Sequence, residues 1–328
     1  MSKRLVGFTD EEFKEKMSSI NRELVSGFLE QSHLSDQTLK QYKSAIYIFC
    51  KWIHDELDNK DIVDLKPRHA LQFQNFLINN GLSSSAIKMR RYAVSSLCGF
   101  IEVYYGDEYP NFRNIYTRAI PSVADTFVKE KKPLSTEEIE KLISVLTEEE
   151  EYQKVAYVLF TFSSGCRREE SRQLLSEVIN YSKHRGKDGS EKNFYVTHNI
   201  RAKGKGKEGK NRRFTFDERT MQAIKQWIEF RESEVDDDDC PYVFVSKYKG
   251  KYRQLSANTF NLWCEQFSKI LGGRPVHPHL FRSSRATIAV RDEGKDIKSV
   301  QKLLGHESSQ TTEIYVIRDD EDDLDDLY

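Results

Sequence analysis

Residues 279 to 315 read HLFRSSRATIAVRDEGKDIKSVQKLLGHESSQTTEIY. His279 and Arg282 are one helical turn apart, so a helix here would present both side chains on one face. Further on, Leu304-Gly305-His306 closes a predicted short helix, with the glycine as its C-terminal breaker. Tyr315 follows nine residues after this histidine. Each piece taken alone is typical of ordinary surface or packing positions, so the rest of the chain has to decide its meaning.

Upstream, Gly165-Cys166-Arg167-Arg168-Glu169-Glu170 has the pattern Gly-x-Arg-x-x-Glu and follows a predicted helix, residues 151 to 162. Two apolar runs, FYVT at 194–197 and RFTF at 213–216, flank a tip rich in Gly and Lys. Such runs around a turn predict a β-hairpin, here with a long tip. Helices are predicted to resume at Glu218, near Ser256, near Phe281 and near Asp296. This part of the chain is therefore predicted to be mostly α with a small β-sheet.

The first third of the chain predicts a small all-helical domain. Its apolar residues recur at helical spacing in four segments, and each of the last three has a start signal. These segments are Glu11 to Leu29, Ser35 to Ile53 with Ser35 as cap, a helix opening at Pro67 and ending at Asn80-Gly81, and a helix beginning near Ser83.

A stretch without periodicity separates the two parts. Pro121 to Pro133, PSVADTFVKEKKP, is bounded by prolines and is predicted to be a linker. Directly after it, Ser135 and Glu138 form a capping box ahead of a new apolar pattern. We therefore expect a helical domain at residues 1–120, a linker at 121–133 and a second domain at 134–328.

Composition is that of a globular protein, with 38% hydrophobic and 31% charged residues. No apolar run approaches a membrane span, and the N-terminus has no secretory signal, so a cytoplasmic protein is expected. The five cysteines, Cys50, Cys98, Cys166, Cys240 and Cys264, are scattered singly, which favours small buried thiols over disulfides or a metal site.

Net charge does not point to nucleic acid, because its formal value is only −1. The charge is nevertheless sorted along the sequence. Residues 201 to 213 hold seven Lys or Arg against one Glu, whereas seven of the last ten residues are acidic. The average therefore conceals a basic segment and an acidic tail.

Together, these motifs resemble the signature of the tyrosine recombinases of the phage integrase family. That family shows an Arg in a Gly-x-Arg-x-x-Glu turn, a hairpin Lys, His-x-x-Arg, Leu-Gly-His and then a Tyr nine residues on. The order and internal spacings agree, and the resemblance covers most of residues 30 to 316. It implies a two-domain fold, with a helical core-binding domain and a mixed α+β catalytic domain. One departure is Ser283, where many members place another His.

The resemblance implies the role of each catalytic residue. Tyr315 would attack phosphorus and form a 3′-phosphotyrosyl bond, which stores the energy of the broken linkage, so that neither ATP nor another high-energy cofactor is needed for rejoining. The resemblance also implies cleavage without a metal, so no metal and no cofactor are expected. Arg167 and Arg282 would bind the non-bridging phosphate oxygens with paired hydrogen bonds. His279 would act in proton transfer and His306 would hydrogen-bond the phosphoryl group.

A hairpin lysine would be the general acid. Lys203 matches the family's position best, although the long tip leaves Lys205 or Lys207 as alternatives. Double-stranded DNA is the expected partner, with self-association as dimer or tetramer on the DNA. Predicted DNA contacts are Lys88, Arg90, Arg91, Lys205, Lys207, Lys210 and Arg212.

Two functional hypotheses follow. The first is a site-specific recombinase, whether for integration or excision. The second is a catalytically silent DNA-binding protein on the same fold, such as a repressor or accessory factor, because fold alone does not dictate activity. For the acidic tail, docking on a neighbouring subunit and a purely solvated tail both stay open.

Overall fold

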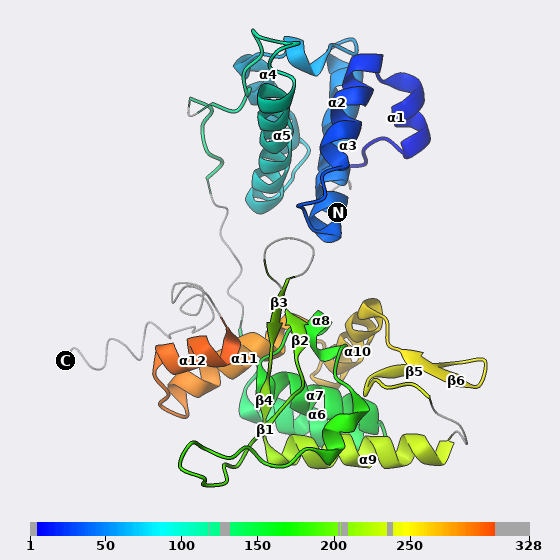
Figure 1. Ribbon diagram of the computed structural model, residues 1–328, viewed down its shortest axis with the longest axis vertical. Coiled ribbons are helices and arrows are strands. Elements are labelled where there is room, and N and C mark those ends of the chain that lie inside the picture. The colour runs from blue at the N-terminus through cyan, green and yellow to red at the C-terminus, as the bar shows by residue number, and fades with distance from the viewer. Residues whose placement is uncertain are drawn as a thin grey trace, which may run out of the picture. The chain divides into compact units, whose positions relative to one another are not determined.

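The computed structural model describes residues 5–117, 119–124, 132–202, 204, 209–234 and 239–305. These residues form two units, an N-terminal unit up to residue 124 and a C-terminal unit from residue 132 (Figure 1). The predicted linker at 121–133 is described only at its two ends, and its interior lies outside these ranges. Within them, no helix combines the length and the apolar character that crossing a bilayer requires.

The N-terminal unit is all-helical, as predicted. Its helices are α1 (Asp10–Lys16), α2 (Ser19–Leu29), α3 (Asp36–Glu56), the 3-10 helix η1 (Ile62–Asp64), α4 (Pro67–Asn79) and α5 (Ser84–Tyr104). The caps follow the sequence, because Ser35 and Ser83 each accept a hydrogen bond from a backbone N–H of the first turn. Helix α5 packs against α2, α3 and α4 around a core of aromatic and aliphatic side chains.

One prediction in this unit was wrong. The segment Glu11 to Leu29 is two helices, because Met17 has an extended backbone and Ser18 caps α2 with a hydrogen bond from the N–H of Asn21. The Asn21 side chain then accepts a hydrogen bond from Ile62 N–H at 2.7 Å, which joins this corner to η1. Helical spacing of the apolar residues continued across the break, so periodicity alone did not reveal it.

The C-terminal unit is mixed, with packed helices and small antiparallel ribbons (Figure 1). Its elements are α6 (Thr136–Glu148), α7 (Tyr152–Ser164), α8 (Arg168–Ser171), the 3-10 helix η2 (Ser176–Asn180), β1 (Tyr195–Val196), β2 (Ile200–Ala202), β3 (Lys210–Arg212), β4 (Thr215–Phe216), α9 (Glu218–Glu234), β5 (Val245–Tyr248), β6 (Lys251–Gln254), α10 (Ala257–Ile270), α11 (Pro278–Arg291) and α12 (Ile297–Leu304).

Helix α7 is the centre of this unit, because it packs against α6, α9 and α11. It is apolar on most sides, as a helix buried in a core must be. Its Tyr157 is fully buried and stacks on Phe260 of α10 at 4.5 Å between ring centroids. The predicted capping box of Ser135 and Glu138 is present at the start of α6. The stacking of Tyr157 thus anchors the middle of α7 to α10.

The predicted hairpin is confirmed and is longer than its two apolar runs. Strand β1 pairs with β4, with Tyr195 opposite Phe216, and β2 continues the ribbon by pairing with β3. The second ribbon, β5 with β6, was missed in the sequence. The five cysteines are outside disulfides, four of them buried and Cys240 half-buried, in agreement with the prediction.

Candidate active site

Arg282 joins three motifs that lie far apart in the sequence. It lies on α11 and its side chain is fully buried. One terminal nitrogen donates to the carbonyl of Gly165 at 2.5 Å, and the other donates to the carbonyl of Leu304 at 2.7 Å. A guanidinium is a planar fork of donors, so it can fix two carbonyl groups at once. The end of α7, helix α11 and the end of α12 therefore meet at one point.

The Gly-x-Arg-x-x-Glu spacing has a local structural cause. Arg167 is the N-cap of α8, and its backbone N–H donates to Glu170 Oε2 at 2.6 Å. Its side chain also donates to Glu170 Oε1, at 3.0 Å. Glu170 is 1% exposed, whereas the Arg167 side chain is 31% exposed. The buried carboxylate thus orients an arginine that remains accessible to a ligand.

Positions 165 and 305 both require glycine, because the backbone is left-handed there and a neighbouring side chain leaves no room for a Cβ. Gly165 ends α7 with φ of 61°, and a Cβ there would lie 2.6 Å from Leu304 Cδ2. Gly305 ends α12 with φ of 67°, and a Cβ there would collide with the guanidinium of Arg212. Any larger residue would separate the chain segments that Arg282 connects.

Arg212, predicted as a DNA contact, lies against the C-terminus of α12. Its guanidinium donates to the carbonyls of Leu304, at 2.5 Å, Lys302, at 2.9 Å, and Leu303. It also lies over the ring of Phe214 at 4.7 Å, and burial lowers its pKa. A cation at a helix C-terminus satisfies orphan carbonyls and opposes the helix dipole. Strand β3 is thereby attached to α12, while Lys210 on the same strand is exposed.

His279 lies in the first turn of α11, half-buried, and one turn before Arg282. The departure at Ser283 is also explained locally. The Ser283 side chain is buried, and its hydroxyl donates to the carbonyl of Leu280 at 2.9 Å within the helix. The Ser283 hydroxyl is thus satisfied by the backbone of its own helix.

Lys203, Lys205, Lys207, His306 and Tyr315 lie outside the described residues. Two of them directly follow residues that are described. Lys203 follows Ala202, the last residue of β2, and His306 follows Gly305. Strand β2 pairs with β3, and Arg212 of β3 binds the end of α12. The hairpin strand that precedes Lys203 is therefore joined through β3 to the helix end that precedes His306. Across the described ranges, no three His, Cys, Asp or Glu side chains gather closely enough to hold a metal ion.

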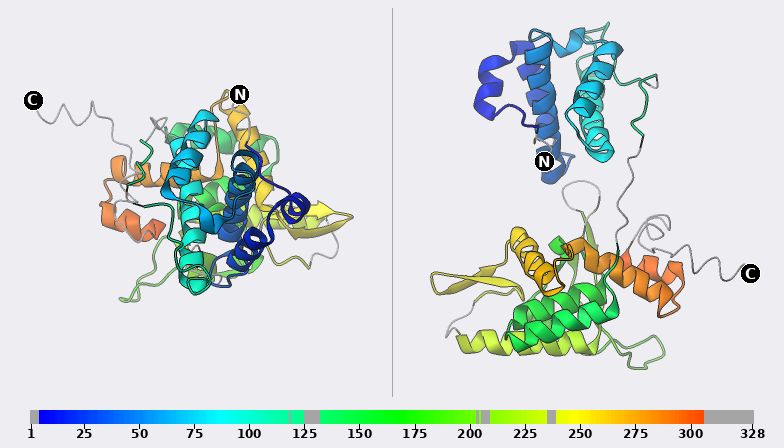
Figure 2. Two further views of the ribbon diagram at one scale, coloured as in Figure 1. Left: turned by 90° about the horizontal axis from the view of Figure 1, so that it is seen from above. Right: turned by 180° about the vertical axis from the view of Figure 1, so that it is seen from behind.

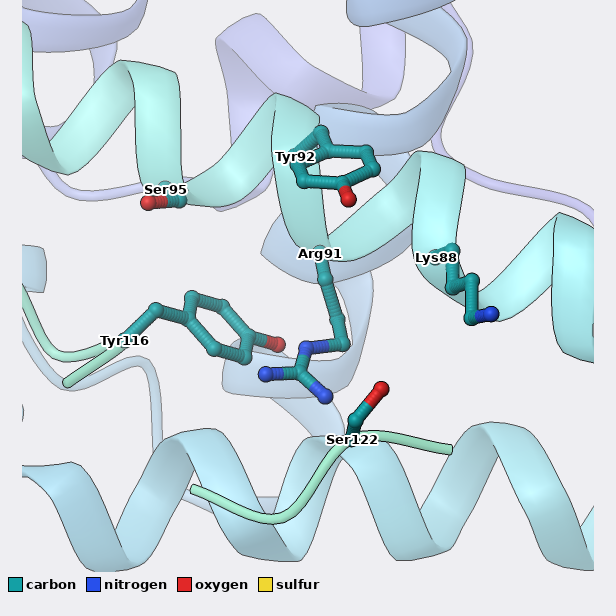
Figure 3. A pocket seen from close by; sticks show the side chains of 6 residues that line it. All are labelled: Lys88, Arg91, Tyr92, Ser95, Tyr116 and Ser122. Carbon is teal, nitrogen blue, oxygen red and sulfur yellow. The ribbon is translucent and has the colours of Figure 1, made fainter. Parts of the chain in front are cut away.

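The three basic residues predicted on α5 have different environments. Arg90 is half-buried and donates to the carbonyl of Ala86 at 3.0 Å. Arg91 donates to the carbonyl of Pro121 at 2.7 Å and lies over the ring of Tyr116. Lys88 and Arg91 line a pocket together with four residues that carry hydroxyl groups, Tyr92, Ser95, Tyr116 and Ser122 (Figure 3). With two cations and no acid in its lining, this pocket is suited to an anion.

Comparisons with known proteins agree with this geometry. The model of the phage integrase family matches residues 132–322. The chain is 30% identical over 319 residues to the SPbeta prophage-derived recombinase-like protein YomM of Bacillus subtilis, covering 96% of this chain and 92% of that protein. It is 28% identical over 288 residues to the tyrosine recombinase XerA of Pyrococcus furiosus, covering 88% and 86%.

Solved structures show the same fold. The Tn1549 transposon integrase in complex with circular intermediate DNA has a TM-score of 0.69 at 16% identity, covering 94% of this chain and 99% of that one. A lambda integrase dimer bound to a core site has a TM-score of 0.62 at 15% identity, covering 90% and 95%. The predicted fold class, mostly helical with small β-ribbons in a two-domain tyrosine-recombinase fold, is confirmed.

Proposed function

The chain belongs to the phage integrase family, and from this premise we propose that it is a site-specific recombinase that cuts and rejoins duplex DNA through Tyr315. The observation that carries the proposal is the position of Arg282, whose guanidinium joins the Gly-x-Arg turn, the His-x-x-Arg helix and the Leu-Gly-His helix end. The three motifs of the family resemblance therefore meet at one point, as a shared active site requires.

The chemistry is a transesterification at phosphorus. The Tyr315 oxygen attacks, the bond from phosphorus to the 5′ oxygen breaks, and the DNA stays attached as a 3′-phosphotyrosyl ester. His279 accepts the tyrosine proton, and a hairpin lysine, Lys203 first, gives a proton to the departing 5′ oxygen. Rejoining reverses these steps with a new 5′ hydroxyl, so no external energy source is consumed.

Two arginines stabilise the transition state in this scheme. Arg167, accessible and oriented by Glu170, and Arg282 neutralise the non-bridging oxygens, and His306 adds a hydrogen bond. Duplex DNA as substrate and assembly of several copies on it are part of the same proposal. They are supported by the neighbours solved with DNA, one of which is a dimer on its core site.

One observation favours the second candidate, a catalytically silent DNA-binding protein. Both terminal nitrogens of Arg282 already donate to carbonyl groups, and Arg167 is paired with Glu170. These contacts stabilise the fold whether or not a phosphate is cleaved. In an active enzyme, Arg282 would have to bind the phosphate as well as these carbonyl groups, and a guanidinium has five N–H donors in all.

The decisive experiment uses DNA from the flanks of the chain's own gene, carrying a nick that traps the cleaved strand. We expect the wild type to form a covalent adduct on a denaturing gel, and Tyr315→Phe to bind the DNA equally well without forming it. Tyr104→Phe is the matched control, because Tyr104 is 71% exposed and lies in the other unit. Arg167→Ala should lower the cleavage rate about a hundredfold or more, as loss of one oxyanion donor does. A wild type that binds the DNA but never forms an adduct would support the silent protein.

A further inference from the structure

The β5–β6 ribbon is a second basic element, separate from the hairpin of the active site. Figures 1 and 2 show it projecting from the C-terminal unit on the side away from α11 and α12. Its turn, Lys249-Gly250, has positive φ at both residues, which suits a tight two-residue hairpin. Val245 and Leu255 at its base are buried, so the ribbon is anchored while its tip is exposed.

The charge of this ribbon has one sign. Between Ser246 and Arg253 the sequence SKYKGKYR holds four cations and no acid. Lys247 pairs with Glu234 at the end of α9, at 3.4 Å. Lys249, Lys251 and Arg253 are all exposed, and among the described residues none of the three has a carboxylate within ion-pairing distance. Three positive charges are thus available to an external anion.

Tyrosines alternate with these cations. Tyr248 stands opposite Lys251 across the ribbon, and Lys247 stands opposite Tyr252. Tyr248 is 52% exposed, with the Arg253 guanidinium 4.3 Å from its ring centroid and Lys249 at 5.5 Å. These cation–π contacts hold Arg253 and Lys249 beside an exposed ring, so that their charges stay at the surface of the ribbon.

We propose that the β5–β6 ribbon binds the phosphate backbone of duplex DNA away from the cleaved bond. Its exposed residues Tyr248, Lys249, Lys251 and Arg253 would form the contact surface. Lys251 and Arg253 are two residues apart on one strand, hence on one face and about 7 Å apart, a spacing that suits neighbouring phosphates. A two-stranded ribbon is also narrow enough to enter the major groove. The inference rests on the proposed function for its choice of DNA over another polyanion.

The test asks whether DNA affinity depends on where positive charge is removed or only on how much is removed. The ribbon variant combines Lys249→Gln, Lys251→Gln and Arg253→Gln. The control variant removes the same charge elsewhere in the unit, where the exposed lysines Lys141, Lys187 and Lys269 are changed to Gln. Both are made in a Tyr315→Phe background, so that binding is measured without cleavage. Affinity for a labelled duplex of arbitrary sequence is followed by fluorescence anisotropy over a range of salt concentrations.

Each lost phosphate contact should reduce the slope of log Kd against log salt by about 0.9. We expect the ribbon variant to lose about 2 to 3 units of slope and to bind at least ~10-fold more weakly at low salt. The control variant should keep a slope and an affinity close to those of the Tyr315→Phe parent. Circular dichroism should show both folded. Equal slopes in the two variants would overturn the proposal. The proposal would also be overturned if the ribbon variant kept its DNA affinity but self-associated more weakly, because that result would indicate the acidic tail of another copy as the partner.

These results are independent of catalysis. If the wild type forms no adduct but the ribbon variant still loses slope, the proposed function fails and the ribbon remains a DNA contact. If the wild type is active and the slopes are equal, only the inference about the ribbon fails.

Discussion

Gly165→Ala tests whether the close approach of α7 and α12 holds the site together. The new methyl group would lie 2.6 Å from Leu304 Cδ2, and Leu304 is fully buried. Left-handed backbone costs a non-glycine residue about 1 to 2 kcal/mol. Overpacking a core of this density adds about 1 to 3 kcal/mol. The free energy of unfolding of the C-terminal unit should therefore fall by about 2 to 5 kcal/mol.

Gly294→Ala is the matched control. Gly294 lies in the same unit and has the same φ, 61°, but no atom within 4 Å of its added Cβ. It should lose only the backbone cost, about 1 to 2 kcal/mol. Urea unfolding is followed by tryptophan fluorescence in a Trp52→Phe background, which leaves Trp227 and Trp263 as reporters of the C-terminal unit. If both variants lose the same free energy, Leu304 moves aside freely and the argument for a rigid junction is wrong.

Three further predictions concern other parts of the chain. Arg212→Met keeps the bulk but removes the hydrogen bonds to the end of α12, and should destabilise the C-terminal unit by about 1 to 2 kcal/mol in the same unfolding assay. In native protein near pH 8, a thiol reagent should modify only Cys240 quickly, because the other four thiols are buried. Burial raises the pKa of Cys166, Cys98 and Cys264 to about 12 and raises that of Cys50 as well, which leaves almost no thiolate; fast labelling of more than one thiol would contradict this. Truncation after Arg318 should leave DNA affinity equal or higher, because seven acids are lost, and a clear loss of cooperative assembly would instead indicate a docked tail.

The sequence predicted those features whose causes are local. The capping box at Ser135, the end of α12 at Gly305 and the hairpin formed by residues 194–197 and 213–216 all depend on neighbouring residues and turn chemistry. The break at Ser18 was missed although its signal was present, because a serine cap inside a continuous apolar pattern was outweighed by periodicity.

The contacts of the arginines could not be predicted in the same way. Arg212 binds carbonyls about ninety residues away along the chain, and Arg282 binds the carbonyl of Gly165 across more than a hundred. Nothing near either residue in the sequence distinguishes an arginine that holds a helix end from one that meets a phosphate. The basic ribbon was missed for a related reason, because its alternating Lys and Tyr residues lack the apolar face that marks most strands.

A net charge of −1 is compatible with DNA binding because acids and bases are segregated in this chain. Seven acids lie in the last ten residues, and without those seven negative charges the formal charge would rise from −1 to +6. Surface charges act on a phosphate only within about a Debye length, roughly 8 Å in physiological salt. The salt dependence of binding is therefore set by the cations that lie beside the DNA. In the described part of the C-terminal unit, Lys210 and the ribbon's Lys249, Lys251 and Arg253 are exposed and Arg167 is partly exposed, so we expect these cations to set the salt dependence. The exposure of individual basic residues thus identifies candidate DNA contacts that the isoelectric point conceals.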